Sequence, residues 1–277
     1  MGSLKSYVML AGILAVATST TARAADLLPP PEMPHYQHEE IGGNWYLRGD
    51  VGVGFMDYSK TVGLNTAPAG AIQTGYRGLS KDLGDQVFVG AGVGYQFNSW
   101  LRFDVTGEYR TKAKWNFLEQ DTNFFPNAYN LESGHLSSVV GLANVYIDLG
   151  NWWGVTPFVG GGIGVVNHMF SSVLDVGAGA YIGGLGYSKD YDKTDLAWAI
   201  HAGLAYDVSP NLKLELAYRY LNMGDARTGT IVCQPPACGL QFHYKLKEVE
   251  SHDFKVGMRW MLGGPVGYEP PPLIRKY

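Results

Sequence analysis

The sequence lacks any apolar run long enough to cross a bilayer as a helix. Its longest such run extends from Tyr7 to Ala17, whereas a transmembrane helix needs about 20 apolar residues. It also lacks a strong charge of either sign, because 21 basic residues face 25 acidic ones and the formal net charge is −4. This balance gives no electrostatic basis for nucleic-acid binding. If the protein enters a membrane, it must therefore do so as strands.

Residues 1–24 have the pattern of a secretory signal peptide. Lys5 places a positive charge ahead of the apolar run, and Ala22-Arg23-Ala24 fits the small-x-small cleavage pattern. Residues 25–43 follow with four prolines and no core-forming pattern, which is typical of an extended linker. We therefore expect an exported chain that begins with a Pro-rich periplasmic linker.

Cysteine is scarce, since the chain contains only Cys233 and Cys238. In an exported protein a close pair of cysteines predicts a disulfide. A zinc site would need a second pair of ligands at a suitable spacing, and the sequence offers none. We predict a Cys233–Cys238 disulfide, no metal site and no cofactor.

Glycine and aromatic residues, in contrast, are abundant. The chain has 37 glycines and 13% aromatic residues, a composition that favours an all-β protein. From Trp45 to Phe55 the residues alternate between an apolar face and a face that carries Arg48, Asp50 and two glycines. Because successive side chains of a strand point to opposite faces, this stretch predicts a strand with one apolar and one polar side.

The same alternation recurs and predicts eight strands of about ten residues each. The predicted strands are 44–57, 86–97, 100–113, 137–149, 155–169, 195–208, 212–220 and 253–262. Short turns alternate with four long segments, which are 58–85, 114–136, 170–194 and 224–250. Such a pattern is typical of membrane barrels, which have short periplasmic turns and long outer loops. We predict an all-β fold, an eight-stranded antiparallel transmembrane β-barrel over 44–262, with four long extracellular loops.

A secreted lipocalin is the alternative, because it is also an eight-stranded barrel but has an apolar interior. Three features favour the membrane barrel. Aromatic residues gather at both ends of the apolar faces, as expected at two membrane interfaces. Opposite charges follow one another on the polar faces, and glycines crowd these same faces, as expected in a narrow lumen.

The polar faces supply the expected ion pairs of the lumen. Within single strands we expect Arg48 to pair with Asp50, Arg102 with Asp104, and Lys213 with Glu215. The complete set of expected lumen residues is Arg48, Asp50, Arg102, Asp104, Glu108, Arg110, Lys213, Glu215, Arg219, Lys255 and Arg259. Buried charges are tolerated when they are paired and hydrogen-bonded. We expect a plug of ion pairs, and a small-solute pore is the alternative.

The order of these features resembles a known family. A signal peptide, the mature start Ala25-Asp26, a proline linker and a first strand from Trp45 to Gly52 are similar to the small eight-stranded outer-membrane proteins of α-proteobacteria. That group includes major surface antigens and haemin-binding barrels. The resemblance implies the outer membrane of a Gram-negative bacterium, with outer-membrane lipid and lipopolysaccharide as neighbours. It also implies that Ala25 and Asp26 form a peptidoglycan attachment point.

The end of the last predicted strand resembles an outer-membrane assembly signal. The residues that carry this resemblance are Lys255, Gly257, Trp260 and Leu262. The resemblance implies recognition by the barrel-assembly machinery. Family members usually stop at the terminal hydrophobic residue, whereas this chain continues through 263–277, which we assign as a periplasmic C-terminal tail.

The predicted role is a structural, surface-exposed barrel that supports envelope integrity and is tethered to peptidoglycan. The alternative is a receptor or adhesin that binds haem or a host ligand through its long loops. His135, His243 and His252 lie in or beside those loops and are candidate haem ligands, although solvated histidines are the simpler interpretation. His168 lies near Ser171 and Ser172. Because no acid lies in register with them, we predict no enzymatic activity.

Overall fold

The computed structural model describes residues 44–66, 69–234 and 241–262. These residues belong to the second of two compact units, Glu40–Tyr277. The predicted signal peptide, the linker and the C-terminal tail lie outside the described residues. Within the described ranges, no helix has the length and apolarity needed to cross a membrane.

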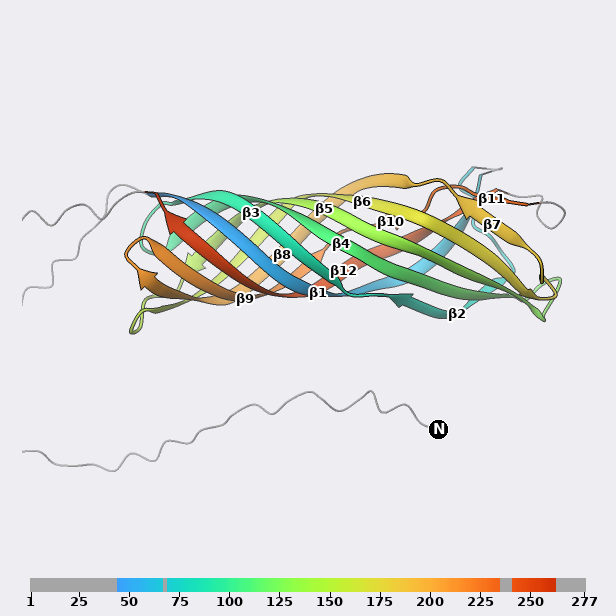
Figure 1. Cartoon of the computed structure of the whole chain (residues 1–277), viewed down its shortest axis with the longest axis horizontal. Coiled ribbons are helices and arrows are strands. Elements are labelled where there is room, and N and C mark those ends of the chain that lie inside the picture. Colours follow the sequence, from blue (N-terminus) through green and yellow to red (C-terminus); the bar gives the residue numbers. More distant parts are fainter. Residues whose placement is uncertain (1–43, 67–68, 235–240, 263–277) are drawn as a thin grey trace, which may run out of the picture. The chain divides into compact units, whose positions relative to one another are not determined.

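Eight strands form a closed antiparallel ring in the described part of the chain (Figure 1). In order around the ring they are β1 (Asn44–Asn65), β3 (Gln86–Gln96), β4 (Leu101–Asp121), β5 (Ala128–Asp148), β6 (Val155–Gly179), β8 (Tyr191–Ser209), β9 (Leu212–Asn222) and β12 (Phe242–Met261). The ring closes because β12 pairs with β1, from Tyr46↔Met261 to Asn65↔Phe242. This closure confirms the predicted eight-stranded antiparallel barrel.

Four shorter strands add to the wall at the end opposite the three short turns (Figure 1). β2 (Tyr76–Leu83) pairs with β4, and β10 (Ala226–Arg227) pairs with β12. β7 (Leu185–Ser188) lies between β6 and β11 (Ile231–Cys233). We call the end of the barrel that holds these strands the outer end.

The prediction of four long loops is wrong in one respect, because strands occupy much of the four long segments. β4 has 21 residues, β6 has 25 and β12 has 20, whereas a tilted strand crosses a bilayer in about 9–11 residues. The barrel wall therefore continues well beyond the length that a membrane requires.

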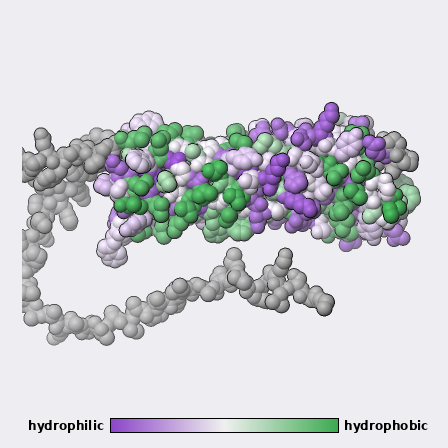
Figure 2. All heavy atoms as spheres, in the orientation of Figure 1, coloured by the Kyte–Doolittle hydropathy of each residue, from purple (hydrophilic) through white to green (hydrophobic). Residues whose placement is uncertain are grey.

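The half of the barrel beside the short turns is apolar outside and polar inside. Its outward side chains include Leu47, Val51, Val89 and Leu216, all exposed, while Arg48 and Glu215 between them are buried. Figure 2 shows hydrophobic side chains over the end that holds the β8–β9 turn, and hydrophilic ones gathered beyond them. Exposed aromatic residues border this apolar band at Trp45, Phe97, Trp152, Trp153, Tyr206 and Trp260 on one side and at Phe55, Tyr109 and Tyr218 on the other.

The outer half has the opposite polarity. Its interior is an apolar core that includes Tyr58, Trp115, Phe170 and Leu246, each no more than 1% exposed. The Trp115 ring packs edge-on against Phe170, with centroids 5.6 Å apart. An apolar interior and a polar exterior are what water outside the membrane favours.

β-bulges produce part of this inversion. In β4 the register shifts between Arg110 and Ala113, so Tyr109 points outward whereas Trp115, at the same parity in the sequence, is buried. Ser172 in β6 and Glu248 in β12 have φ values of 54° and 53°, a conformation that accompanies bulges and bends. A bulge reverses the faces of all later residues, which is why the alternation alone could not place them.

Candidate functional site in the lumen and at the outer end

Arg48 is the centre of an ion-pair network in the apolar-banded half of the barrel. Its guanidinium lies 2.8 Å from Asp50, 2.7 Å from Asp104 and 3.2 Å from Glu215. It also donates a hydrogen bond to the Tyr146 hydroxyl at 3.1 Å. Because these partners come from β1, β4, β5 and β9, one buried side chain connects four strands.

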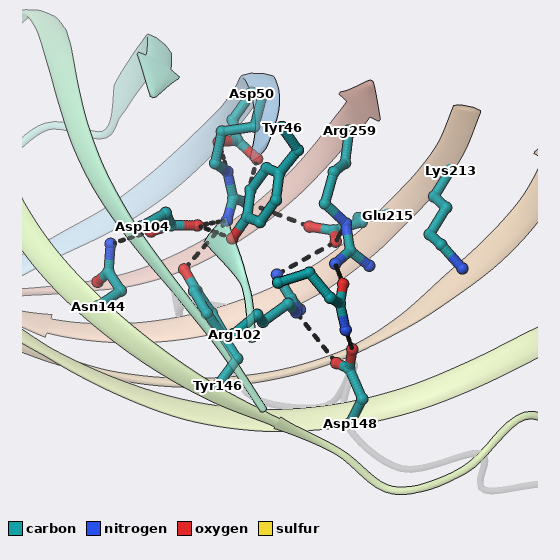
Figure 3. A network of polar contacts seen from close by, with 12 residues as sticks. Tyr46, Asp50, Arg102, Asp104, Asn144, Tyr146, Asp148, Lys213, Glu215 and Arg259 are labelled. Atoms are coloured by element: carbon teal, nitrogen blue, oxygen red, sulfur yellow. Dashed lines mark hydrogen bonds and ion pairs between the residues drawn. The ribbon is translucent and has the colours of Figure 1, made fainter. Parts of the chain in front are cut away.

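Glu215 joins this cluster to two further arginines (Figure 3). One of its carboxylate oxygens lies 3.1 Å from Arg259 and 3.5 Å from Arg102. Arg102 also pairs with Asp148 at 3.0 Å, and its guanidinium lies 4.1 Å from the centroid of the Tyr146 ring. The aromatic face supplies the electrostatic contact that a buried cation needs when carboxylates occupy only one side.

A second group of ion pairs lies nearer the outer end. Asp253 is 2.6 Å from both Arg110 and Arg219, and Glu108 is 3.0 Å and 2.8 Å from the same two arginines. Both guanidiniums lie over the Phe88 ring, at 4.8 Å and 5.1 Å from its centroid. Two cations and two anions therefore neutralise each other within one layer.

The charges of these two groups of ion pairs balance. Their buried basic residues are Arg48, Arg102, Arg110, Arg219, Lys255 and Arg259, and their buried acidic residues are Asp50, Asp104, Glu108, Asp148, Glu215 and Asp253. Each of these acids has a basic partner within 3.5 Å. This is the arrangement expected of a filled lumen, since an unpaired charge at such burial is costly.

The pairing differs from the expected one for Arg102. Arg48 does pair with Asp50, two residues along the strand, but Arg102 pairs with Asp148 and Glu215 and not with Asp104. Neighbours on one face of a strand are about 6.6 Å apart, and partners across a lumen this narrow are equally near. Strand spacing alone therefore cannot select the partner.

Lys213 is a second correction. It pairs with Asp207 across the β8–β9 turn and not with Glu215, and both members of that pair are partly exposed. It therefore belongs to the rim of the barrel. Asp148 and Asp253 are the acids that the expected set of lumen residues omitted, although both lie on predicted polar faces.

Glycine makes room for the large lumen side chains at two close approaches. A Cβ atom at Gly94 would overlap the Tyr46 ring, and one at Gly257 would overlap the Asp50 carboxylate. Gly257 thus has a packing role in the lumen, beside its place in the predicted assembly signal. Trp260 and Leu262 of that signal are exposed on the outer face.

Three carboxyl groups meet inside the outer half, in what we call the outer acid cluster: Glu119, Glu132 and Asp175. The Tyr244 hydroxyl lies 2.8 Å from an oxygen of both Glu119 and Glu132. The single hydroxyl proton can be donated to one of these carboxyl groups at a time, so the contact with the other is favoured when that group is protonated and donates to the Tyr244 oxygen. The geometry therefore favours a protonated acid in the cluster.

Burial also raises the pKa values of this cluster. It raises the pKa of Glu119 to about 7 and that of Asp175 to about 6. The pKa of Glu132 is raised well above its usual range, first by burial and then by the neighbouring Asp175 and Glu119. The sequence interpretation missed these residues because it assigned 114–136 and 170–194 to loops. The parity of Trp115, Phe117 and Glu119 was the available signal.

The histidines within the described ranges do not converge on one site. His168 bonds to Ser138 and to the Met223 carbonyl oxygen, both at 2.9 Å, in the buried interior, and not to Ser171 or Ser172. His252 bonds to the Tyr218 hydroxyl at 2.7 Å on the outer surface, whereas His243 is buried. Among the residues that the structure describes, no group of three or more His, Cys, Asp and Glu side chains is arranged to hold a metal.

The predicted disulfide involves β11. Cys233 is the last residue of β11, pairs in register with Gly186 of β7 and is not a free thiol. Its expected partner, Cys238, lies outside the described residues, so the Cys233–Cys238 pairing stays a prediction.

An apolar surface, which we call the outer patch, lies on the outside of the wall near the outer end. Its members are Leu131, Leu174, Val176, Leu185, Tyr187 and Val232, each 42–47% exposed. Leu131 lies opposite Val176, Val176 opposite Leu185, and Tyr187 opposite both Leu174 and Val232. The register therefore makes the patch continuous across β5, β6, β7 and β11. Ile182, 84% exposed, lies in the adjacent β6–β7 turn.

A closed barrel with an apolar outer band, aromatic borders and a charge-filled lumen defines an outer-membrane β-barrel. The chain belongs to the family described as "Outer membrane protein beta-barrel domain", whose model matches residues 11–261. The protein is accordingly located in the outer membrane of a Gram-negative bacterium, in contact with lipid and lipopolysaccharide.

Several proteins and one solved structure are similar to this chain. An uncharacterized protein of Brucella abortus is 30% identical over 78% of this chain and 80% of its own length. The Rickettsia prowazekii protein called "Putative adhesin RP828" is 26% identical over 80% of this chain and 89% of its own. The outer membrane protein OprG of Pseudomonas aeruginosa is 15% identical, covers 79% of this chain and 96% of its own, and has a TM-score of 0.49.

Proposed function

We propose that this protein is a surface adhesin that binds a partner through the outer patch. The observation that carries the proposal is the continuous apolar surface formed by Leu131, Leu174, Val176, Leu185, Tyr187 and Val232. Exposed apolar patches of this kind commonly mark interaction sites. The patch lies on the outer half of the barrel, whose exterior is otherwise polar, beyond the apolar band that contacts lipid.

The scaffold beneath the patch favours binding. The patch side chains stand on paired strands, and the wall behind them is filled by the core that includes Phe170 and Ile231. A rigid platform lowers the entropy cost of association. The adhesin named among the relatives supports the same conclusion.

The test is adhesion of a non-adherent Gram-negative strain that displays the full-length protein on its surface. Replacing Leu185 and Tyr187 together by Ser should lower the number of bacteria bound to epithelial cells at least about tenfold, because aromatic and apolar anchors dominate protein interfaces. Ile72→Ser is the matched control, since Ile72 is 62% exposed but lies outside the patch. Equal adhesion by the displaying strain and an empty-vector strain would contradict the proposal.

We further propose the envelope role predicted from the sequence, with Ala25 and Asp26 as the peptidoglycan attachment. Both residues lie outside the described ranges. Support comes from the rim where β1 begins: the Leu262 amide donates to Trp45 and the Met261 amide to Asn211 of the β8–β9 turn, both at 2.8 Å. The start of β1 and the end of β12 thus lie beside the short turns, which face the periplasm in barrels of this class.

The attachment is tested by mass spectrometry of muramidase-digested cell walls. A muropeptide on the Ala25 amine is expected, and it should decrease in the Asp26→Lys variant. A free Ala25 amine on all protein in the wall fraction would contradict the attachment. The filled lumen gives no support to the alternative of a small-solute pore, and the separated loop histidines give none to a haem site.

A further inference from the structure

The outer half of the barrel wall has a seam between β1 and β2. β1 pairs with β3 from Asn44 to Gly54, and its pairing with β12 on the other side continues to Asn65. β2 lies beside the outer part of β1 but, in the described chain, pairs with β4 alone. Between Met56 and Val62, β1 therefore has an edge without a backbone partner among the described strands.

The seam edge of β1 is capped by side chains at Tyr58. The Tyr58 amide donates to the Asp57 carboxylate at 2.7 Å, and the Tyr58 carbonyl oxygen accepts a bond from the Lys81 ammonium of β2. Asp57 and Lys81 are themselves an ion pair at 2.9 Å, and both are substantially exposed. We call this arrangement the Asp57–Lys81 clip. It occupies the amide and the carbonyl that an added antiparallel strand would use.

β2 offers the opposite edge of the seam. Its residues from Tyr76 to Asp82 are exposed. The register of β2 against β4 shifts between Gly78 and Ser80, so Leu79 is left without a β4 partner. An exposed strand edge of this kind is a template for pairing with another chain.

The surroundings of the seam are basic. Exposed Lys60 of β1, Arg77 of β2, and Lys112 and Lys114 of β4 outnumber exposed Asp82 and Asp85, by four to two. On the same strands, Asp57 and Lys81 neutralise each other in the clip. This excess of positive charge attracts an acidic partner and opposes a basic one.

We propose that an extended acidic peptide pairs with β1 as an added strand, antiparallel at Tyr58, and displaces the Asp57–Lys81 clip together with the adjoining part of β2, which moves outward. The peptide carbonyl replaces the Asp57 carboxylate on the Tyr58 amide, and a peptide amide replaces the Lys81 ammonium on the Tyr58 carbonyl. Main-chain bonds supply affinity in strand addition of this type. The displaced side chains return to water, where an exposed ion pair loses little.

This inference goes beyond the proposed adhesin function and uses a different surface. The seam involves β1, β2 and β4, whereas the outer patch lies on β5, β6, β7 and β11. Variants of one surface therefore leave the other unchanged, and either proposal can fail alone.

The experiment uses the full-length protein refolded into lipopolysaccharide-containing nanodiscs. The probe is a fluorescent peptide of alternating Glu and Val, with a Lys-Val peptide as the charge control and an N-methylated Glu-Val peptide as the backbone control. Fluorescence anisotropy measures binding, and hydrogen exchange measures protection of the segment that contains Tyr58. We expect the Glu-Val peptide to bind about tenfold more tightly than either control and to slow exchange at Tyr58.

Charge variants complete the design. Replacing Lys112 and Lys114 together by Glu should weaken Glu-Val binding about tenfold, whereas Lys189→Glu, at an exposed lysine between β7 and β8, should leave it unchanged. Binding without slower exchange at Tyr58 would overturn the proposal. So would the absence of binding, which would leave the clip as a guard against edge-to-edge aggregation.

Discussion

Glu215 carries one negative charge among three arginines. Arg48, Arg102 and Arg259 lie 3.2, 3.5 and 3.1 Å from its carboxylate oxygens. Arg259 has no other carboxylate within ion-pair distance among the described residues; its other polar contact is a hydrogen bond to Gln96. The stability of the lumen therefore depends strongly on this one side chain.

Replacing Glu215 by Gln should destabilise the barrel by about 3–5 kcal/mol, because it leaves the buried Arg259 without a countercharge and removes one countercharge from Arg48 and Arg102. Urea unfolding of the refolded protein in lipid vesicles, followed by tryptophan fluorescence, measures the loss. Asp207→Asn is the matched control, since its pair with Lys213 is partly exposed at the rim and should contribute no more than about 1 kcal/mol. Equal losses in the two variants would mean that burial does not determine how much these ion pairs contribute to stability.

At the scale of the elements, the sequence predicted the banded half of the barrel and missed the outer half. From Trp45 to Phe55 the alternation of β1 predicts the same outer and inner face without interruption, and the structure confirms it. In β12, Phe242, Tyr244 and Leu246 have the parity of the outward Phe254 and Trp260, yet they are buried. Glu248, whose backbone has a φ of 53°, separates the two parts, and no residue pattern predicts this conformation at that position.

The partners of the charged residues were beyond prediction for a related reason. Alternation places a side chain in the lumen, but the choice among acids on facing strands depends on register and on the barrel's small radius. Arg48 and Asp50 pair because both lie on one strand, whereas Arg110 of β4 pairs with Asp253 of β12, and two strands of the ring lie between them. The outer acid cluster likewise joins three strands, and Tyr244 adds a fourth.

The outer acid cluster makes the outer half sensitive to pH. Its pKa values are raised in the folded protein, to about 7 for Glu119 and about 6 for Asp175, from 4.5 and 3.8. At pH values between the unfolded and the folded pKa of each group, the folded state binds more protons than the unfolded state, so stability falls as pH rises. The protection of backbone amides in β4 and β5 of the outer half, measured by hydrogen exchange and corrected for the intrinsic exchange rate at each pH, should therefore be higher at pH 5 than at pH 8.

The Glu132→Gln variant should reduce this pH dependence, because Gln can bond to Tyr244 and Asp175 without ionising. β9, in the apolar-banded half, is the internal reference, since it lies outside the cluster. If the corrected protection of the outer half were lower at pH 5 than at pH 8, the protonated cluster would be excluded.

β12 offers a test of the assembly signal. Trp260 is 56% exposed on the apolar band, so Trp260→Asp places a charge on the lipid-facing side of the last strand, which is destabilising there. We expect lower levels of heat-modifiable barrel in the outer membrane, measured on gels of boiled and unboiled membranes. Trp153→Asp, in the β5–β6 turn and 99% exposed, should assemble normally. Normal levels of the Trp260→Asp protein would show that this residue is not part of the signal.

At the scale of the whole molecule, the barrel consists of two halves with opposite polarity. One half is apolar outside and charge-filled inside, which suits lipid, and the other is polar outside and apolar inside, which suits water. The short turns, the start of β1 and the end of β12 all lie at the apolar-banded half. The outer half, with the outer patch and the seam, therefore lies outside the cell.

The most direct test of this orientation is cysteine labelling of intact cells with a membrane-impermeant maleimide. Phe124→Cys, at the β4–β5 turn and 78% exposed in the wild-type protein, and Ser99→Cys, in the exposed β3–β4 turn, are the two sites. Phe124→Cys should react on intact cells, whereas Ser99→Cys should react only after the outer membrane is permeabilised. Labelling of Ser99→Cys on intact cells, with Phe124→Cys protected, would contradict the account.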